Sequence, residues 1–516
     1  MARITRRDLL RLGVYTAGAS LLGARELKGF PLFHDDLPRS PATIPFQRPL
    51  PIPPAPREVA PFTPTCTLPD VVEPCLNGHD PDPECAPGVT RYFEVEMKEQ
   101  DVELIPGLTT RIWGYDGFFP GPTFSVNKGE RLVVRQTNNL PEFTSVHLHG
   151  GHTPAESDGH PILVIPPSGF RDYCYPNCHR AATQWYHDHA DRVTGHNVYM
   201  GLAGFYIVHD QNELSLGLPS GDQDVAMVFQ DRRFFPDGSL FYDPFDHDGF
   251  LGDKFLVNGA IQPFFEVSRR KYRFRFLNGS NARYYELFLS SGQPFVQIAT
   301  DGALLPAPLV RRSIRLAMAE RVEVVVDFSQ YPVGTSLTLD NCLIQEDGRG
   351  PKEVNRRRCT PLVRFDVVSN AVDDSVVPDL LLDVPVQVDL PPVRTRRFDF
   401  ERRNGAWAIN GKFFDGGVRV DADPRLCTSE VWVLRNKSGG WEHPIHIHHE
   451  DFVILRRNGR RPPLHERGFK DTVNLGPNDE VRVHIPFVTF TGKYVFHCHN
   501  LEHEDMEMMG QFEVLP

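Results

Sequence analysis

The chain has 516 residues, and its 55 Lys and Arg against 67 Asp and Glu give a formal net charge of -12 at pH 7. This length excludes a peptide or a small disulfide-stapled scaffold, and the excess of negative charge argues against nucleic acid as a partner. The 46 prolines exceed the usual share of about 5%, which favours short strands, turns and loops over helical bundles. Histidine is also abundant, with 21 residues that cluster.

Residues 1–30 have the layout of a twin-arginine export signal. Arg6 and Arg7 precede a short apolar stretch that reaches Ala24. The stretch contains Arg11 and is shorter than the ~20 residues needed to cross a bilayer, so we expect an export address and no stable membrane span here or elsewhere. The predicted location is periplasmic, secreted or cell-surface, with the twin-arginine export machinery as a partner.

A proline-rich arm is predicted over 31–89. Eleven prolines stand between Pro31 and Pro64, and they leave little capacity for a helix or a strand ladder. We expect this arm to lie as an extended strap on the surface of the folded domains.

Nine cysteines are present, and Cys498 is set aside because it stands between two histidines. The other eight are an even number, as expected for disulfides in an oxidising compartment. Cys174 and Cys178 are close enough for a local loop bridge, and Cys342 with Cys359 could close a hairpin insertion. The sequence leaves the pairing of four open: Cys66, Cys75, Cys85 and Cys427.

From Thr90 onward the sequence predicts an all-β chain, because alternating apolar segments of five to eight residues are separated by Gly, Pro and Asn. The expected strands are 90–97, 131–137, 203–209, 273–278, 322–328, 430–435, 480–485 and 494–497. Once per third of the chain a strand ends at an asparagine: Asn138, Asn278 and Asn436. This recurrence favours a repeated sandwich or barrel domain, with limits near 90–212, 213–375 and 376–516.

The histidines form four His-x-His pairs. Residues i and i+2 of a strand face the same side, so each pair presents two imidazoles to one site. Eight neutral imidazoles without a carboxylate suit copper, iron or zinc better than calcium or magnesium. The pairs are His147 and His149, His187 and His189, His446 and His448, and His497 and His499.

Cys498 identifies the metal, because its position between His497 and His499 points its side chain to the opposite strand face and a second site. A thiolate with two imidazoles and a weak axial thioether is the blue-copper ligand set. One strand would then connect the blue copper to the histidine site and carry electrons between them. The candidate ligands are Cys498, His443, His503 and Met508, with Met506 and Met509 as competitors for the thioether.

Among these candidates, His443 is the one that directly precedes a proline. We expect it to lie outside the strand pairing because Pro444 interrupts the ladder, which would let His443 aim at the thiolate site while His446 and His448 aim elsewhere.

These motifs resemble those of the multicopper oxidase family, which includes laccases, bilirubin oxidases and bacterial spore-coat laccase. The matching segments are His147–Gly151, Ser157–Gly159, Trp185–His189, His443–His448 and His497–Asp505. The resemblance implies an all-β fold of three cupredoxin-like Greek-key β-barrel domains, with a type 1 copper in the third and a trinuclear cluster between the first and third. It also implies four copper ions and a reaction that couples four one-electron oxidations of a reducing substrate to reduction of dioxygen to water.

The resemblance also implies the ligands of each ion. The type 1 copper would take His443, Cys498, His503 and Met508. The type 2 copper would take His147 and His446. The type 3 pair would take six histidines: His149, His187, His189, His448, His497 and His499.

Two carboxylates have positions that look like the acidic residues of bacterial laccases near dioxygen entry and exit. Asp158 and Glu504 would relay the protons that water formation consumes, although Asp158 in Ser-Asp-Gly is also typical of a plain turn. Asp451 or Glu442 could orient a ligand imidazole. We expect the remaining histidines to be surface groups or to surround the ligands: His152, His160, His196, His449 and His465.

The expected donor is a bulky organic molecule: a phenol, an aromatic amine or a bilirubin-type tetrapyrrole. The segment 407–411 looks like bilirubin oxidases, whereas 467–473 looks like spore-coat laccase and phenoxazinone synthase, so the sequence leaves this choice open. The eight methionines without a Met-rich insert depart from cuprous oxidases of the copper-efflux type.

Three alternatives stay open, the last two from other classes of protein. They are a metal-oxidising (cuprous or ferrous) multicopper oxidase, a non-catalytic copper-binding or coat protein, and a copper nitrite reductase, which would not need eight paired imidazoles. The sequence does not indicate the oligomeric state or the redox potential.

Overall fold

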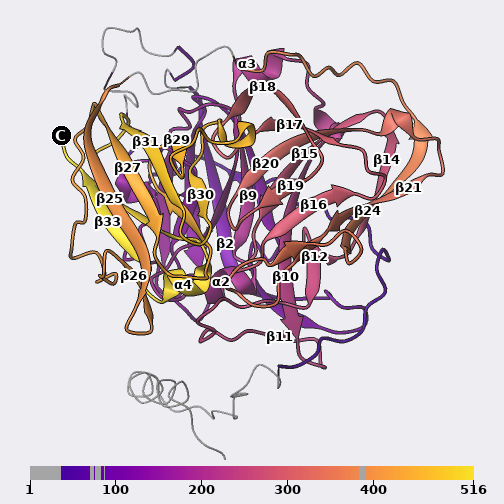
Figure 1. The fold of residues 1–516 in the computed structure, drawn as a ribbon, viewed down its shortest axis with the longest axis horizontal. Coiled ribbons are helices and arrows are strands. Elements are labelled where there is room, and N and C mark those ends of the chain that lie inside the picture. Colours follow the sequence, from indigo (N-terminus) through magenta and orange to yellow (C-terminus); the bar gives the residue numbers. More distant parts are fainter. Residues whose placement is uncertain (1–36, 70–74, 76–82, 86–87, 383–389) are drawn as a thin grey trace, which may run out of the picture.

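The computed structural model describes residues 37–69, 75, 83–85, 88–382 and 390–516. Strands make up most of the described chain and the helices are short (Figure 1), so the all-β prediction is confirmed. None of the helices in these ranges has the length and apolar character needed to cross a membrane. The predicted export signal at 1–30 lies outside the described residues.

The strands of residues 58–209, here called unit 1, form two sheets. One sheet has the order β1-β2-β5-β7, with β3 paired to β2, and the other has the order β4-β9-β8-β6. The first contains β1 (Glu58–Val59), β2 (Thr90–Val102), β3 (Thr110–Tyr115), β5 (Arg131–Asn138) and β7 (Phe170–Tyr175). The second contains β4 (Gly121–Asn127), β6 (Val146–His149), β8 (Ala182–Asp188) and β9 (Ala203–His209).

Residues 224–370, unit 2, also form two large sheets. One contains β10 (Asp224–Phe234), β11 (Leu240–Phe241), β12 (Lys254–Val257), β13 (Ala260–Ile261), β15 (Lys271–Asn278), β17 (Phe295–Ala299), β18 (Leu304–Arg311) and β20 (Arg321–Asp327). The other contains β14 (Phe264–Arg269), β16 (Tyr285–Leu289), β19 (Ile314–Leu316), β21 (Ser336–Asn341) and β24 (Thr360–Asn370). A small hairpin of β22 (Leu343–Ile344) and β23 (Glu353–Val354) projects from this unit.

Residues 392–514, unit 3, form the last two sheets, seen as orange and yellow strands in Figure 1. One contains β25 (Pro392–Arg403), β26 (Ala406–Ile409), β27 (Thr428–Asn436), β29 (Val453–Arg457) and β31 (Glu480–Phe487). The other contains β28 (His443–Ile447), β30 (Thr472–Leu475), β32 (Gly492–Cys498) and β33 (Met509–Val514). The α-helices are α2 (Thr194–Met200), α3 (Gln211–Ser215) and α4 (Leu501–Asp505). All eight predicted strands are therefore present.

The strand-ending asparagines perform the same local task in all three units. Asn138, Asn278 and Asn436 end the second strand of a parallel pair, β2/β5, β10/β15 and β25/β27. Each buried amide donates Nδ2 hydrogen bonds to at least two backbone carbonyls and accepts one at Oδ1 from the backbone amide two residues on. The sequence recurrence thus corresponds to a structural repeat, while the domain limits near 90–212, 213–375 and 376–516 stay predictions.

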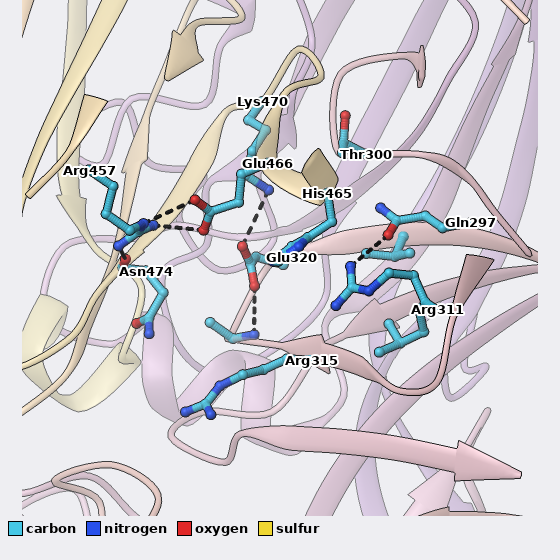
Figure 2. A pocket seen from close by; sticks show the side chains of 13 residues that line it. Gln297, Thr300, Arg311, Arg315, Glu320, Arg457, His465, Glu466, Lys470 and Asn474 are labelled. Atoms are coloured by element: carbon cyan, nitrogen blue, oxygen red, sulfur yellow. Dashed lines mark hydrogen bonds and ion pairs between the residues drawn. The ribbon is translucent and has the colours of Figure 1, made fainter. Parts of the chain in front are cut away.

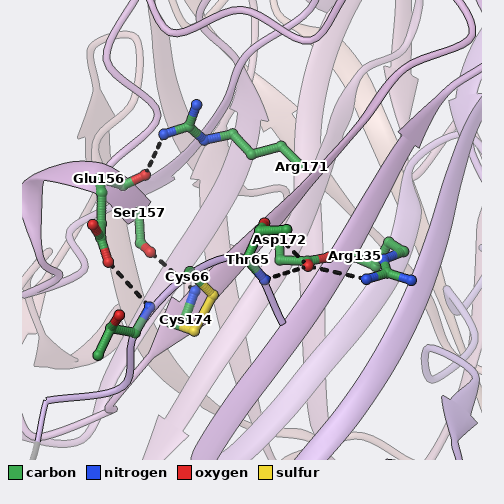
Figure 3. Close-up of a disulfide and its surroundings, with 9 residues drawn as sticks. Thr65, Cys66, Arg135, Glu156, Ser157, Arg171, Asp172 and Cys174 are labelled. Carbon is green, nitrogen blue, oxygen red and sulfur yellow. Dashed lines mark hydrogen bonds and ion pairs between the residues drawn. A yellow bond between two sulfur atoms is a disulfide. The ribbon is translucent and has the colours of Figure 1, made fainter. Parts of the chain in front are cut away.

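The described residues of the proline-rich arm contact both unit 2 and unit 1, while the limits 31–89 stay a prediction. Leu50 donates its backbone hydrogen bond to Phe264 of unit 2, and β1 pairs with β2 of unit 1. Figure 3 shows where the strap is fastened to β7: the backbone amide of Thr65 donates to Asp172 at 2.8 Å, and the next residue, Cys66, forms a disulfide. The strap therefore gains ladder hydrogen bonds only where a prolyl ring is absent.

Four disulfides connect the eight cysteines other than Cys498, which is free and buried. The predicted Cys342–Cys359 bridge is confirmed, at the base of the β22–β23 hairpin. The suggested Cys174–Cys178 bridge is wrong, because each of these cysteines instead ties a different part of the arm to unit 1. The pairs are Cys66–Cys174, Cys75–Cys427, Cys85–Cys178 and Cys342–Cys359.

The asparagine repeat generates a stability prediction. Replacing Asn278 by Ala removes its three described hydrogen bonds and leaves two buried carbonyls without this donor, so the free energy of unfolding should fall by about 1–3 kcal/mol. Guanidinium chloride titration measures this change. Asn370→Ala, at the exposed end of β24, is the matched control and should change stability by less than about 0.5 kcal/mol. Equal effects at both positions would contradict a structural role for the repeat.

Candidate metal centre

Two antiparallel strand pairs bring the histidine motifs together. In unit 1, β6 pairs with β8 so that His147 lies opposite His187. In unit 3, β28 pairs with β32 so that His446 lies opposite His497. The two pairs face each other across the boundary between units 1 and 3, because a ring nitrogen of His147 lies 3.3 Å from one of His446. The structure therefore forms one histidine site from residues of unit 1 and unit 3.

Five of the eight imidazoles form two tight groups. His147 and His446 approach through their Nε2 atoms. His497 forms the centre of the second group, with its Nε2 at 3.1 Å from that of His189 and 3.2 Å from that of His448. Ring nitrogens at these distances can converge on a single ion.

The other three imidazoles, of His149, His187 and His499, form a third group. The ring centroid of His499 lies 5.2 Å from each of the other two. The indole of Trp185 stacks on His187, with centroids 4.1 Å apart, and lies beside His149 and His499. The buried indole of Trp185 thus covers this side of the site.

The outer nitrogens of several rings are fixed by oxygen acceptors. Since a backbone carbonyl only accepts, the ring Nδ1 must donate, which leaves the Nε2 lone pair directed into the site. These pairs are His147 Nδ1 with Asp158 O (2.6 Å), His446 Nδ1 with Asp471 O (2.9 Å), His187 Nδ1 with Asp188 O (2.8 Å) and His497 Nδ1 with Cys498 O (3.2 Å).

The inward-facing nitrogens fit a transition metal. Burial lowers the pKa of His187 to about 4 and that of His189 to about 3, so both are neutral ligands at pH 7. His149 Nδ1, His187 Nε2 and both ring nitrogens of His499 are buried without a hydrogen-bond partner. Because an unpartnered buried polar atom is costly, these nitrogens point to ion binding, and an all-imidazole set suits copper.

A second site lies on the opposite face of β32. The Sγ atom of Cys498 is 3.4 Å from His443 Nδ1 and 3.6 Å from His503 Nδ1, and the two nitrogens are 3.2 Å apart. Met508 is fully buried, and its carbonyl accepts the backbone hydrogen bond of Cys498 at 3.1 Å. Burial raises the pKa of the Cys498 thiol, so a bound cation is needed to hold the thiolate. The set fits a blue copper.

The expectation that His443 lies outside the strand pairing is wrong. His443 begins β28 and pairs with Leu475 of β30. Strand alternation explains its orientation instead, since residues an odd number of positions apart face opposite sides. His443 therefore faces the Cys498 site, while His446 faces the histidine site.

Asp158 and Glu504 both reach the histidine site, on different histidines. Asp158 Oδ2 lies 2.8 Å from His448 Nδ1, and burial raises the pKa of this carboxyl well above its usual value. Glu504 Oε2 lies 2.9 Å from His497 Nδ1 and its Oε1 lies 3.4 Å from His189 Nδ1. Burial raises the pKa of Glu504, but His497 and His189 outweigh it and bring the pKa to about 2. A plain turn role for Asp158 does not account for these contacts.

The sequence reasoning missed Asp471 and Arg321. Asp471 Oδ1 lies 3.1 Å from His149 Nε2, which leaves Nδ1 of that ring to face the site, and the Asp471 carbonyl holds His446. Arg321 of unit 2 donates to Asp471 at 2.8 Å and to the carbonyl of Thr183 at 2.9 Å. Unit 2 supplies no histidine to the two sites, yet its arginine positions ligands from both other units. In the sequence, Asp471 falls within segment 467–473, but no contact with a histidine could be predicted for it.

Other secondary predictions need correction. Neither Asp451 nor Glu442 is hydrogen-bonded to a clustered imidazole: Glu442 accepts from Asn474, and Asp451 lies 3.7 Å from His152. Three of the five remaining histidines are buried, although the sequence gave them no partner, and only two are intermediate in exposure. The buried ones are His152, His160 and His449; the intermediate ones are His196 and His465.

Comparisons with known proteins agree with this geometry. Two family models described as multicopper oxidase match residues 96–213 and 388–516. The chain is 40% identical to a bilirubin oxidase of Albifimbria verrucaria, over 82% of this chain and 77% of that protein. It is 36% identical to a laccase of Bacillus subtilis, over 82% of this chain and 94% of that protein.

Solved structures agree as well. A multi-copper oxidase from Pediococcus acidilactici superposes with a TM-score of 0.79 at 30% identity, over 93% of each chain. A multicopper oxidase from Aquifex aeolicus superposes with a TM-score of 0.76 at 29% identity, over 82% of this chain and 96% of the other. With its paired histidines, its buried Cys498 and these relatives, the chain belongs to the multicopper oxidase family.

Proposed function

We propose that the protein is a laccase-like oxidase that binds four copper ions. The type 1 ion binds His443, Cys498, His503 and Met508. The type 2 ion binds His147 and His446. The type 3 pair binds His149, His187, His189, His448, His497 and His499. The observation that carries this proposal is the convergence of eight buried imidazoles next to a cysteine site on the same strand.

Copper bound at these sites would supply one-electron oxidation of the donor and reduction of dioxygen to water. The chain supplies the connection between the sites: Cys498 belongs to one site, and its covalent neighbours His497 and His499 belong to the other. Electrons accepted at Cys498 therefore need to cross only one peptide unit in either direction before they reach an imidazole of the histidine site.

Two carboxylates supply protons for water formation. Glu504 contacts His497 and His189, whereas Asp158 contacts His448 from the other side of the site. Asp158, whose pKa is raised, can hold a proton beside the histidines, whereas Glu504, whose pKa is about 2, is ionised and can accept a proton from water and pass it on. Both act beside the histidines and neither needs to bind the metal.

The proposed donor is an organic molecule: a phenol, an aromatic amine or a bilirubin-type tetrapyrrole. The relatives named laccase and bilirubin oxidase support this class. Beside the thiolate site, the half-buried indole of Trp441 has its ring centroid 5.4 Å from that of the fully buried Trp407 and offers an aromatic contact for such a donor.

We further propose that residues 1–30 direct export through the twin-arginine machinery, to the periplasm, the medium or the cell surface. Four disulfides support an oxidising destination. Each pair of sheets is proposed to be one cupredoxin-like domain, with the limits given above.

Replacing Cys498 by Ser tests the function directly. The variant should lose the intense blue absorption together with oxidation of phenols, aromatic amines and bilirubin under air, because the thiolate is removed from the electron path. Copper analysis should still find the ions of the histidine site, since no ligand of that site is changed. Oxidation at the wild-type rate would refute the mechanism, and a wild type that oxidises only ferrous or cuprous ions would refute the donor class.

Glu504→Gln tests the proton supply. The amide keeps the shape but cannot accept a proton and pass it on as the ionised carboxylate can, so turnover at saturating donor and dioxygen should fall about 10²–10⁴-fold. Copper content should be unchanged, and anaerobic reduction of the blue site by donor, followed by stopped-flow absorption, should stay as fast as in the wild type. Slow anaerobic reduction would instead assign Glu504 to the electron-accepting site.

Arg321→Lys tests the positioning of ligands from unit 2. Lysine lacks the planar fork that reaches Asp471 and Thr183 together, so copper affinity at His147 and His446 should fall about 10–100-fold. The electron paramagnetic resonance signal of the type 2 ion should also change. Arg283→Lys, which alters another buried ion pair of unit 2 with Asp231, is the control and should leave that signal unchanged. Identical spectra for all three proteins would contradict the role of Arg321.

A further inference from the structure

A cavity of about 220 Å³ lies between units 2 and 3, outside the two metal sites. One wall comes from β17 to β20 of unit 2, and the other from the segment between β29 and β30 of unit 3. Figure 2 shows that the side chains around it are mostly charged or polar. An apolar ligand is therefore a poor fit, because it would bury these groups without replacing their hydrogen bonds with water.

Positive charge predominates in the lining, which contains four cations and two carboxylates. Most of this charge is already paired. Arg457 donates to Glu466 and Asp479, each at 2.8 Å, and Lys470 lies 2.7 Å from Asp301 and 3.3 Å from Glu320. These residues form the walls of the cavity and leave little unpaired charge of their own.

Arg311 is the exception among these cations. Its described hydrogen bond runs from Nη1 to the amide oxygen of Gln297 at 3.0 Å, and no described carboxylate lies within ion-pair distance. Burial lowers the pKa of Arg311, and the more distant Glu286 and Glu466 do not fully offset it. A guanidinium has five N–H donors, so most donors of this partly buried cation remain free for a ligand.

His465 belongs to the unit 3 wall and lines the same cavity as Arg311 and Gln297 (Figure 2). Burial, with the positive charge of Arg311, lowers the pKa of His465 to about 4. The ring is therefore neutral at pH 7 and adds an N–H donor without adding charge. An electropositive corner with free donors is the arrangement that binds an anion.

We propose that this cavity binds a small oxyanion, held chiefly by the guanidinium of Arg311. The ligand carries acceptor oxygens and negative charge, as in a carboxylate, a sulfate or a phosphate, because planar Arg forks match such groups. The unpaired positive charge of Arg311 disfavours a metal cation here. Since the walls belong to units 2 and 3, the bound anion bridges the two units and stabilises the folded chain.

Thermal unfolding of the copper-loaded full chain tests this site. Sodium sulfate, phosphate and acetate are titrated at constant ionic strength, and the wild type should show a saturable rise in Tm with the anion that fits. The general salting effect of sulfate does not saturate and acts on all variants alike. A response to sulfate and phosphate alone indicates a tetrahedral ligand, and a response to acetate indicates a carboxylate. No saturable response to any of the three would overturn the proposal.

Arg311→Gln and its neighbour Arg312→Gln form the matched pair, because both remove one positive charge but Arg312 is exposed and does not line the cavity. R312Q should titrate as the wild type does, whereas R311Q should weaken the apparent dissociation constant at least about tenfold, or about 1.4 kcal/mol. Arg311→Lys keeps the charge without the fork and should be intermediate, which keeps the test usable if R311Q folds poorly. Equal titration of R311Q and R312Q would overturn the proposal.

Crystals of the copper-loaded chain soaked in sodium selenate provide the direct observation. The selenium anomalous signal should lie within hydrogen-bond distance of the Arg311 guanidinium. Selenium elsewhere on the surface, with none in the cavity, would refute the site.

Discussion

Eight buried imidazoles direct nitrogen lone pairs toward one another where unit 1 meets unit 3. The hydrogen bonds around them hold the rings in this orientation. Without an ion, the inward nitrogens of His149, His187 and His499 have no hydrogen-bond partner, at a cost of about 1–3 kcal/mol for each buried polar group. Binding of copper to this set therefore also contributes to the folding free energy, because the ion coordinates nitrogens that have no hydrogen-bond partner within the protein. Oxygen acceptors on the outer side of the rings fix the orientation of the imidazoles before the metal binds.

Each of the three units contributes differently to the histidine site. Units 1 and 3 supply the imidazoles, on strands whose registers fix which rings meet. Unit 2 contributes through Arg321, which joins Asp471 to the backbone of unit 1 and thereby keeps His149 and His446 in place. A unit that supplies no histidine to the two sites thus contacts the residues that hold their imidazoles.

Sequence reasoning was sufficient wherever the period of a strand decided the answer. The alternation of Cys498 with His497 and His499 separated two sites correctly, and the strand-ending asparagines revealed a repeat that the hydrogen bonds reproduce. It was insufficient where the partner is distant in the chain. Asp471 and Arg321 are 150 residues apart, and Cys174 pairs with an arm residue 108 positions away. At His443, strand alternation alone gives the observed orientation, because Pro444 does not interrupt the pairing of β28.

The strap and its disulfides also set an order of assembly. Cys75 and Cys427 are 352 positions apart, and no other disulfide includes a residue so near the C-terminus. In a chain synthesised from its N-terminus, this bond is the last of the four for which both cysteines exist. The link between the arm and unit 3 can therefore form only after units 1 and 2 and the first two strands of unit 3, β25 and β26, have been made.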